Sequence, residues 1–93
     1  MKKTTKSTQH QTIARKDGKI IVMLTLIECD YGYQLDEWDA IDKKYLVDRR
    51  YKLDDGTHAI EHYELLQTII MNSDFDEVKE NITEEYLLAK DAD

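Results

Sequence analysis

The longest apolar run in the chain covers residues 20–27 and follows the dipeptide Asp17-Gly18. Asp-Gly between two strand-like segments is a strong signal for a β-hairpin, because both central residues of a type I′ turn need a positive φ. Residues 8–15 and 19–28 are the expected arms of this hairpin. Both faces of the second arm are apolar, which is typical of a central strand that is covered on both sides.

Further along the chain, apolar residues recur at spacings of three and four, which predicts helices over residues 35–44 and 58–72. A third helix is expected to begin after Ser73, with acidic residues in its first turn, where the helix dipole favours them. Its inner face would consist of Phe75, Val78, Ile82, Tyr86 and Ala89. A kink near residue 83, which would divide it into two short helices, is the alternative.

Between these helices, residues 45–53 alternate between apolar and polar positions, which favours a third strand over a continuing helix. Arg49 departs from the alternation, although its long stem could lie along an apolar face with its guanidinium at the edge. The fold class expected is therefore α+β, a small antiparallel sheet packed with two to three helices. The first helix or a second copy of the chain would cover the second face of the central strand. Residues 1–7 are expected to be a flexible basic tail, and residues 8–93 a single domain.

Charge is distributed unevenly along the 93 residues, whose formal net charge is −7. Residues 1–19 hold six basic groups and one acidic group, whereas the remaining chain holds seven basic and 19 acidic groups. Such a body repels nucleic acid and attracts basic partners. The basic island formed by Lys43, Lys44, Arg49, Arg50 and Lys52 is punctuated by acids, which favours local neutralisation.

Cysteine content and targeting signals bear on where the protein is located. Cys29 is the single cysteine, so no internal disulfide can form, and we expect it to be a small hydrophobic residue at the end of its strand. The basic N-terminal segment lacks the apolar core of a signal peptide. The apolar run is also too short to cross a membrane. These features predict a cytoplasmic protein that does not contact membranes.

One motif suggests metal chemistry. His58, Glu61 and His62 spell H-x-x-E-H, in which two histidines four residues apart can hold Zn²⁺ while the glutamate acts as a base. Zinc peptidases with this motif are large and use a further carboxylate ligand from elsewhere, and no such ligand is recognisable here. We therefore expect two histidines beside an apolar helix stripe, and neither an enzyme nor a bound cofactor.

The candidate partner-binding residues are carboxylates and tyrosines. Carboxylates along helices can imitate the phosphates of a nucleic acid, although a Ca²⁺ or Mg²⁺ site and a solvated helix face are alternatives. Tyrosines beside acids resemble the hot spots of protein interfaces. The candidates are Asp36, Glu37, Asp39, Asp74, Asp76, Glu77, Glu80, Tyr31 and Tyr33.

These observations favour a small non-enzymatic inhibitor that binds a protein with a basic surface, such as nucleic-acid-handling machinery. Size and composition alone are those of anti-defence proteins of phages and mobile elements, anti-CRISPR proteins among them. An immunity or antitoxin protein that neutralises a basic nuclease is one alternative. A regulatory homodimer that pairs through the apolar strand is another.

Overall fold

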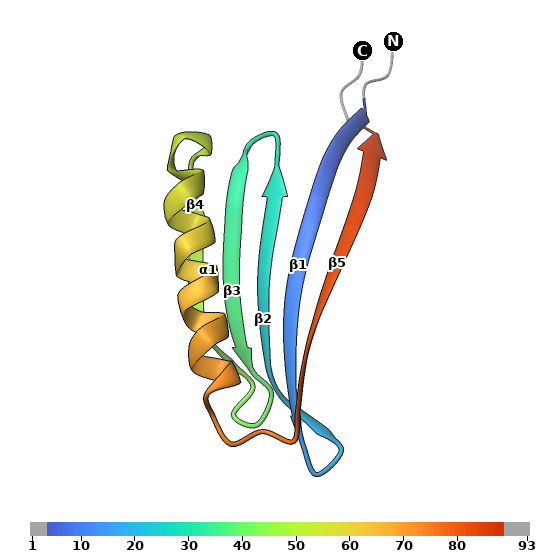
Figure 1. The fold of residues 1–93 in the computed structure, drawn as a ribbon. Coiled ribbons are helices and arrows are strands. Elements are labelled where there is room, and N and C mark those ends of the chain that lie inside the picture. The colour runs from blue at the N-terminus through green and yellow to red at the C-terminus, as the bar shows by residue number, and fades with distance from the viewer. Residues whose placement is uncertain (1–3, 89–93) are drawn as a thin grey trace.

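A computed structural model describes the backbone of residues 4–88 and the side chains of residues 7–84. It shows a five-stranded antiparallel sheet with one α-helix against it (Figure 1). The strand order is β4-β3-β2-β1-β5, so the first and last strands pair with each other. The elements are β1 (Thr4–Lys16), β2 (Lys19–Cys29), β3 (Gly32–Asp39), β4 (Lys44–Tyr51), the short 3₁₀ helix η1 (Leu53–Asp55), α1 (Gly56–Met71) and β5 (Glu77–Leu88).

The hairpin predicted around Asp17-Gly18 is confirmed as β1 and β2. Asp17 and Gly18 have φ values of 53° and 76°, as a type I′ turn requires. The strand predicted over residues 45–53 is confirmed as β4, and the helix predicted over residues 58–72 is confirmed as α1. Ser7, the last residue of the predicted tail, pairs with β5, and residues 1–3 lie outside the described residues.

The helix predicted over residues 35–44 is wrong, because the segment forms β3 and the turn that follows it. Leu35 is fully buried on the face that α1 covers, whereas Trp38 points to the opposite face beside Met23 and Tyr45. The same residues also alternate with a period of two, and pairing with β2 and β4 satisfies their backbone hydrogen bonds. Tertiary pairing therefore overrides the helical spacing.

The third predicted helix is also wrong, because residues 77–88 form β5. Val78 and Ile82 are four residues apart, a spacing that places two side chains on one face of either a helix or a strand. β5 pairs along its length with β1, from Arg15↔Glu77 to Thr4↔Leu88. With one helix instead of two or three, the expected α+β packing is replaced by a sheet-dominated fold.

The core lies between α1 and one face of the sheet. Ala59, Tyr63 and Ile70 of α1 are buried against strand residues that include Ala14, Val22, Leu24, Leu26 and Leu35. The opposite face of the sheet has no described element packed on it (Figure 1). In the described chain no helix lies over the second face of the central strand, because the segment expected to cover it forms β3. Cover by a second copy of the chain stays a prediction. No helix in residues 4–88 is long and apolar enough to cross a membrane.

Candidate functional site

The open face of the sheet carries a row of large side chains. Antiparallel register brings Ile13 beside Met23, Met23 beside Trp38, and Trp38 beside Tyr45. Side chains that lie directly opposite each other on neighbouring strands are in contact range. The side chains of Ile13, Met23 and Trp38 are only partly buried, and Tyr45 is 56% exposed. This row is an apolar and aromatic band across the middle of an otherwise highly charged protein.

The aromatic end of this band forms a small pocket. The rings of Trp38 and Tyr45 are 4.8 Å apart and meet edge to face. Together with Met23, Thr25 and Asp36 they line a cavity of about 280 Å³. Two aromatic rings beside a carboxylate are the side chains that attract an organic cation.

Asp36 gives the pocket its charge, and it lies opposite Asp48 of β4. Its Oδ2 accepts a hydrogen bond of 3.1 Å from Nε2 of Gln34. Its Oδ1 is buried and has no hydrogen-bond donor in the described part of the chain. Burial raises the pKa of Asp36, and the neighbouring Asp48 carboxyl group raises it further. Arg50 offsets part of this rise.

The other predicted acids near β3 lie away from this pocket. Glu37 is on the covered face between Leu24 and Val47, where burial raises its pKa. Asp39 ends β3, and its Oδ1 accepts hydrogen bonds from the backbone N–H groups of Ile41 (2.9 Å) and Asp42 (3.1 Å). Asp39 therefore has a structural role in the β3–β4 turn.

Of the predicted acids of residues 74–80, three contact the first hairpin and one contacts α1. Asp74 forms an ion pair of 3.1 Å with Lys16 and raises the pKa of that lysine, chiefly by the hydrogen bond. The Oδ2 of Asp76 accepts a hydrogen bond of 2.7 Å from the backbone N–H of Asp17. Two further contacts are those of Glu77 with Arg15 (3.2 Å) and of Glu80 with the Tyr63 hydroxyl group (2.8 Å). These carboxylates hold the start of β5 in place and do not form one surface with Asp36.

The two predicted tyrosines have different environments. Tyr31 is 80% exposed in the β2–β3 turn. Tyr33 is partly buried beneath the first turn of α1, where its ring leaves no room for a side chain at position 56. Only Tyr31 is placed to contact a partner without rearrangement.

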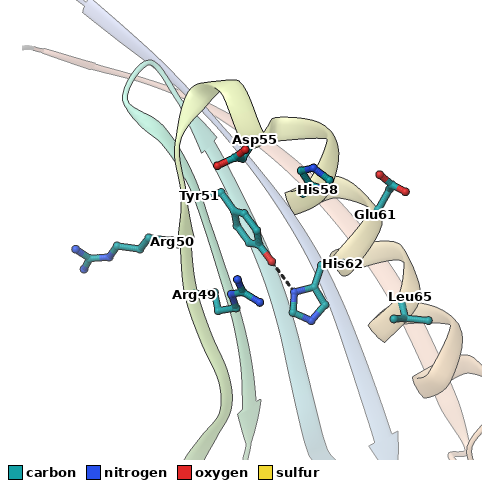
Figure 2. A pocket seen from close by; sticks show the side chains of 8 residues that line it. All are labelled: Arg49, Arg50, Tyr51, Asp55, His58, Glu61, His62 and Leu65. Carbon is teal, nitrogen blue, oxygen red and sulfur yellow. Dashed lines mark hydrogen bonds between the residues drawn. The ribbon is translucent and has the colours of Figure 1, made fainter.

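The H-x-x-E-H segment lies beside a second concavity, between β4 and α1 (Figure 2). His58 and His62 both line this groove, and Nδ1 of His62 is 2.8 Å from the Tyr51 hydroxyl group. Glu61 also lines the groove, and its carboxyl group extends to the outer side of α1 (Figure 2). Among the side chains of residues 7–84 no three His, Cys, Asp or Glu residues are arranged to hold a metal ion.

Asp36 is a sequence-predicted candidate that lines this pocket, whereas the side chains around it are not among the predicted candidates. The sequence analysis places Trp38 on a helix and Tyr45 on a separate strand, and Asp48 is one of the acids that punctuate the basic island. The alternation of Gln34, Asp36 and Trp38 with Tyr33 and Leu35 is the signal that would have placed them on one sheet face. No family model, curated protein or solved structure matches this chain.

Proposed function

We propose that this protein is a non-enzymatic binding protein whose open sheet face docks on a partner protein and takes an arginine or lysine side chain into the pocket of Trp38, Tyr45 and Asp36. The observation that carries this proposal is the buried Oδ1 of Asp36, which lacks a donor in the described chain and lies beside a second carboxylate. A cation from a partner, bound beside this carboxyl group, would compensate its charge. It would also neutralise the repulsion between the two acids.

The chemistry of the pocket favours a cation attached to an apolar segment. A guanidinium or ammonium group against Trp38 and Tyr45 gains about 0.5–2 kcal/mol from the ring faces, depending on its exposure. A charge-assisted hydrogen bond to Asp36 is about twice as strong as a neutral one. Ile13 and Met23 extend the contact area on the same row. The expected partner surface is therefore basic at one point and aliphatic around it.

A second copy of the chain fits this face less well. A two-fold interface apposes the same patch of both subunits. It would therefore bring two Asp36–Asp48 pairs into one contact, where like charges are desolvated together. A partner of opposite charge avoids this penalty. Proteins that handle nucleic acid present such arginines and lysines on their surfaces, and occupation of that surface would inhibit them. An immunity protein bound to a basic nuclease would use the same contacts.

Trp38 is the only tryptophan, so its fluorescence reports directly on the pocket. The test is a titration with short peptides that differ only in a central arginine, lysine, glutamine or glutamate between leucines. We expect the arginine and lysine peptides to change the emission of Trp38, and the other two to have little effect. Asp36→Asn should weaken binding of the arginine peptide at least about tenfold. Asp54→Asn, an exposed acid in η1, is the matched control and should leave binding unchanged.

Two results would overturn the proposal. One is an equal response to the arginine and glutamate peptides, because charge would then play no part. The other is equal binding by the wild type and the Asp36→Asn variant. Salt separates the ionic from the apolar contribution to binding, since binding through a partly exposed ion pair weakens as the ionic strength rises.

A further inference from the structure

The groove between β4 and α1 is a concentration of basic side chains in an acidic protein (Figure 2). It has a volume of about 730 Å³. Its walls come from the end of β4 on one side and from the first turns of α1 on the other. It lies on the covered side of the sheet, whereas the pocket of Trp38 lies on the open side, so the two concavities are separate.

Arg49 is the principal charge of the groove. It lies opposite Leu35 on the covered face, and its guanidinium is 5.1 Å from the centre of the Tyr51 ring. It forms no ion pair with any residue that the structure describes. In Figure 2 its guanidinium turns toward His62, whereas the next residue, Arg50, also lines the groove but extends its guanidinium to the other side of β4.

The imidazoles of His58 and His62 face the groove from one side of the helix, because four residues make about one turn. When the Tyr51 hydroxyl group donates its hydrogen bond to Nδ1 of His62, the Nε2 of that ring carries the proton and becomes a donor. The amino end of α1 adds partial positive charge. Two acids, Asp55 and Glu61, also line the groove, and the carboxyl group of Glu61 extends to the outer side of the helix (Figure 2).

We propose that this groove binds a small phosphate-bearing ligand. The planar guanidinium of Arg49 can hold two oxygens of a phosphate group at once, and the ring nitrogens of His58 and His62 can donate to the others. The groove is much larger than one phosphate ion, and Leu65 lines its lower part. The ligand expected is therefore a phosphomonoester, with its phosphate group at Arg49 and its organic part toward Leu65.

The three histidines of the chain provide the test, because their ring signals are resolved by NMR. His10 is the internal reference, since it is on β1 near Glu28 and outside the groove. The probes are inorganic phosphate and adenosine 5′-monophosphate, with chloride at equal ionic strength as the control. We expect both probes to shift the rings of His58 and His62 and to leave that of His10 in place.

Adjacent arginines supply the matched variants. Arg49→Gln should weaken binding of adenosine 5′-monophosphate at least about tenfold, whereas Arg50→Gln should change it less than about twofold. Arg49→Lys keeps the charge but loses the planar guanidinium group, so its affinity for adenosine 5′-monophosphate should lie between those of the other two variants. Circular dichroism checks that each variant is folded.

Four outcomes would decide between the sources of binding. Tighter binding of the ester than of inorganic phosphate, reduced by Leu65→Ala, supports a phosphomonoester. Equal binding of the two, without an effect of Leu65→Ala, would overturn the ester and leave a site for the free anion. Equal effects of Arg49→Gln and Arg50→Gln would overturn the site altogether. A shift of all three histidines together, or of none at about 20 mM ligand, where a millimolar site is nearly saturated, would also overturn the site.

Discussion

Asp36 shows at the scale of a single residue how stability and function can oppose each other. Its carboxyl group is partly buried beside Asp48, and both features raise its pKa. The ionised form is therefore less favourable in the folded protein than in the unfolded chain. A residue that lowers stability when it is charged is one that a bound cation can compensate.

This reasoning predicts that Asp36→Asn stabilises the protein at pH 7. We expect the free energy of unfolding to rise by about 0.5–1 kcal/mol, a modest gain because solvent screens part of the repulsion. The sign follows from linkage, since a raised pKa in the folded state stabilises at low pH and this advantage is lost as the pH rises. The difference between variant and wild type should therefore shrink toward pH 4. Urea denaturation at both pH values measures it, and a destabilised variant at pH 7 would contradict the account.

The same pKa predicts how cation binding depends on pH. Asp36 attracts a cation only when it is ionised, and its pKa lies above the ordinary value of 3.8. Affinity for the arginine peptide should therefore rise between pH 4 and pH 7, with its midpoint above that value. The emission of Trp38 provides the measurement, and the Asp36→Asn variant should show a smaller rise. Affinity that falls over this range would be inconsistent with a carboxylate in the pocket.

Thr12 is the other residue with a large expected effect, because it is fully buried and polar. Its Oγ1 is 2.7 Å from the Tyr63 hydroxyl group and accepts a hydrogen bond of 3.1 Å from Nε2 of Gln67. Burial raises the pKa of Tyr63, so its hydroxyl group stays protonated and can donate to Glu80. This network fastens α1 to β1 and β5.

We predict that Thr12→Val lowers the free energy of unfolding by about 1–2 kcal/mol, although the two side chains have the same shape. The substitution leaves Gln67 and Tyr63 with fewer partners in a buried place. Thr83→Val on the exposed part of β5 is the control and should have little effect. Thermal and urea denaturation measure both. Equal stability of the two variants would show that the network contributes nothing.

At the scale of elements, the first hairpin and α1 were predicted correctly because each has a strong local signal. The first hairpin has a turn dipeptide between apolar arms, and α1 has a broad stripe of Ala59, Tyr63, Leu66 and Ile70. β3 and β5 resemble helices in sequence because their apolar residues are three or four apart. Pairing with other strands makes β3 and β5 strands instead of helices. The spacing of residues within one segment does not reveal such pairing.

The candidate pocket around Asp36 could be predicted from the sequence only in part. Asp36 stands out for its charge, but its pocket depends on the register between β3 and β4. A bulge after Glu37 shifts that register and brings Tyr45 beside Trp38. The remaining predicted acids lie near each other in sequence and have separate structural roles. The sequence therefore indicates a carboxylate at this position, whereas the residues that surround it depend on strand pairing.

The contact of α1 with β3 gives a prediction at this scale. A Cβ atom at Gly56 would come within 2.5–2.8 Å of the ring and hydroxyl group of Tyr33. Gly56→Ala should therefore lower the free energy of unfolding by about 1–3 kcal/mol, despite the higher helix propensity of alanine. Thr57→Ala, at the next and exposed position, is the control. A stabilised Gly56→Ala variant would mean that Tyr33 does not pack under the helix.

At the scale of the whole molecule, one helix covers one side of a five-stranded sheet. The covered side holds the core and, at the β4 edge, the basic groove. The open side holds the aromatic band and the acidic pocket. The two proposed sites therefore have opposite charge and lie on opposite sides of the sheet.

The open face also predicts the oligomeric state. If the open face binds a partner of opposite charge, the chain without that partner should sediment as a monomer of 11.0 kDa at micromolar concentration. Sedimentation equilibrium at low and high salt measures this. A stable dimer that Trp38→Glu dissociates would assign the face to a second copy of the chain.

The most direct measurement is an NMR map of where the arginine peptide binds. The account predicts that shifts concentrate on the open face, at the indole N–H of Trp38 and the backbone of Thr25, Asp36, Tyr45 and Asp48. Residues along α1 and the histidines of the groove should stay unchanged. Shifts confined to the acids of residues 74–80, or shifts at the open face that the glutamine peptide reproduces in full, would contradict it.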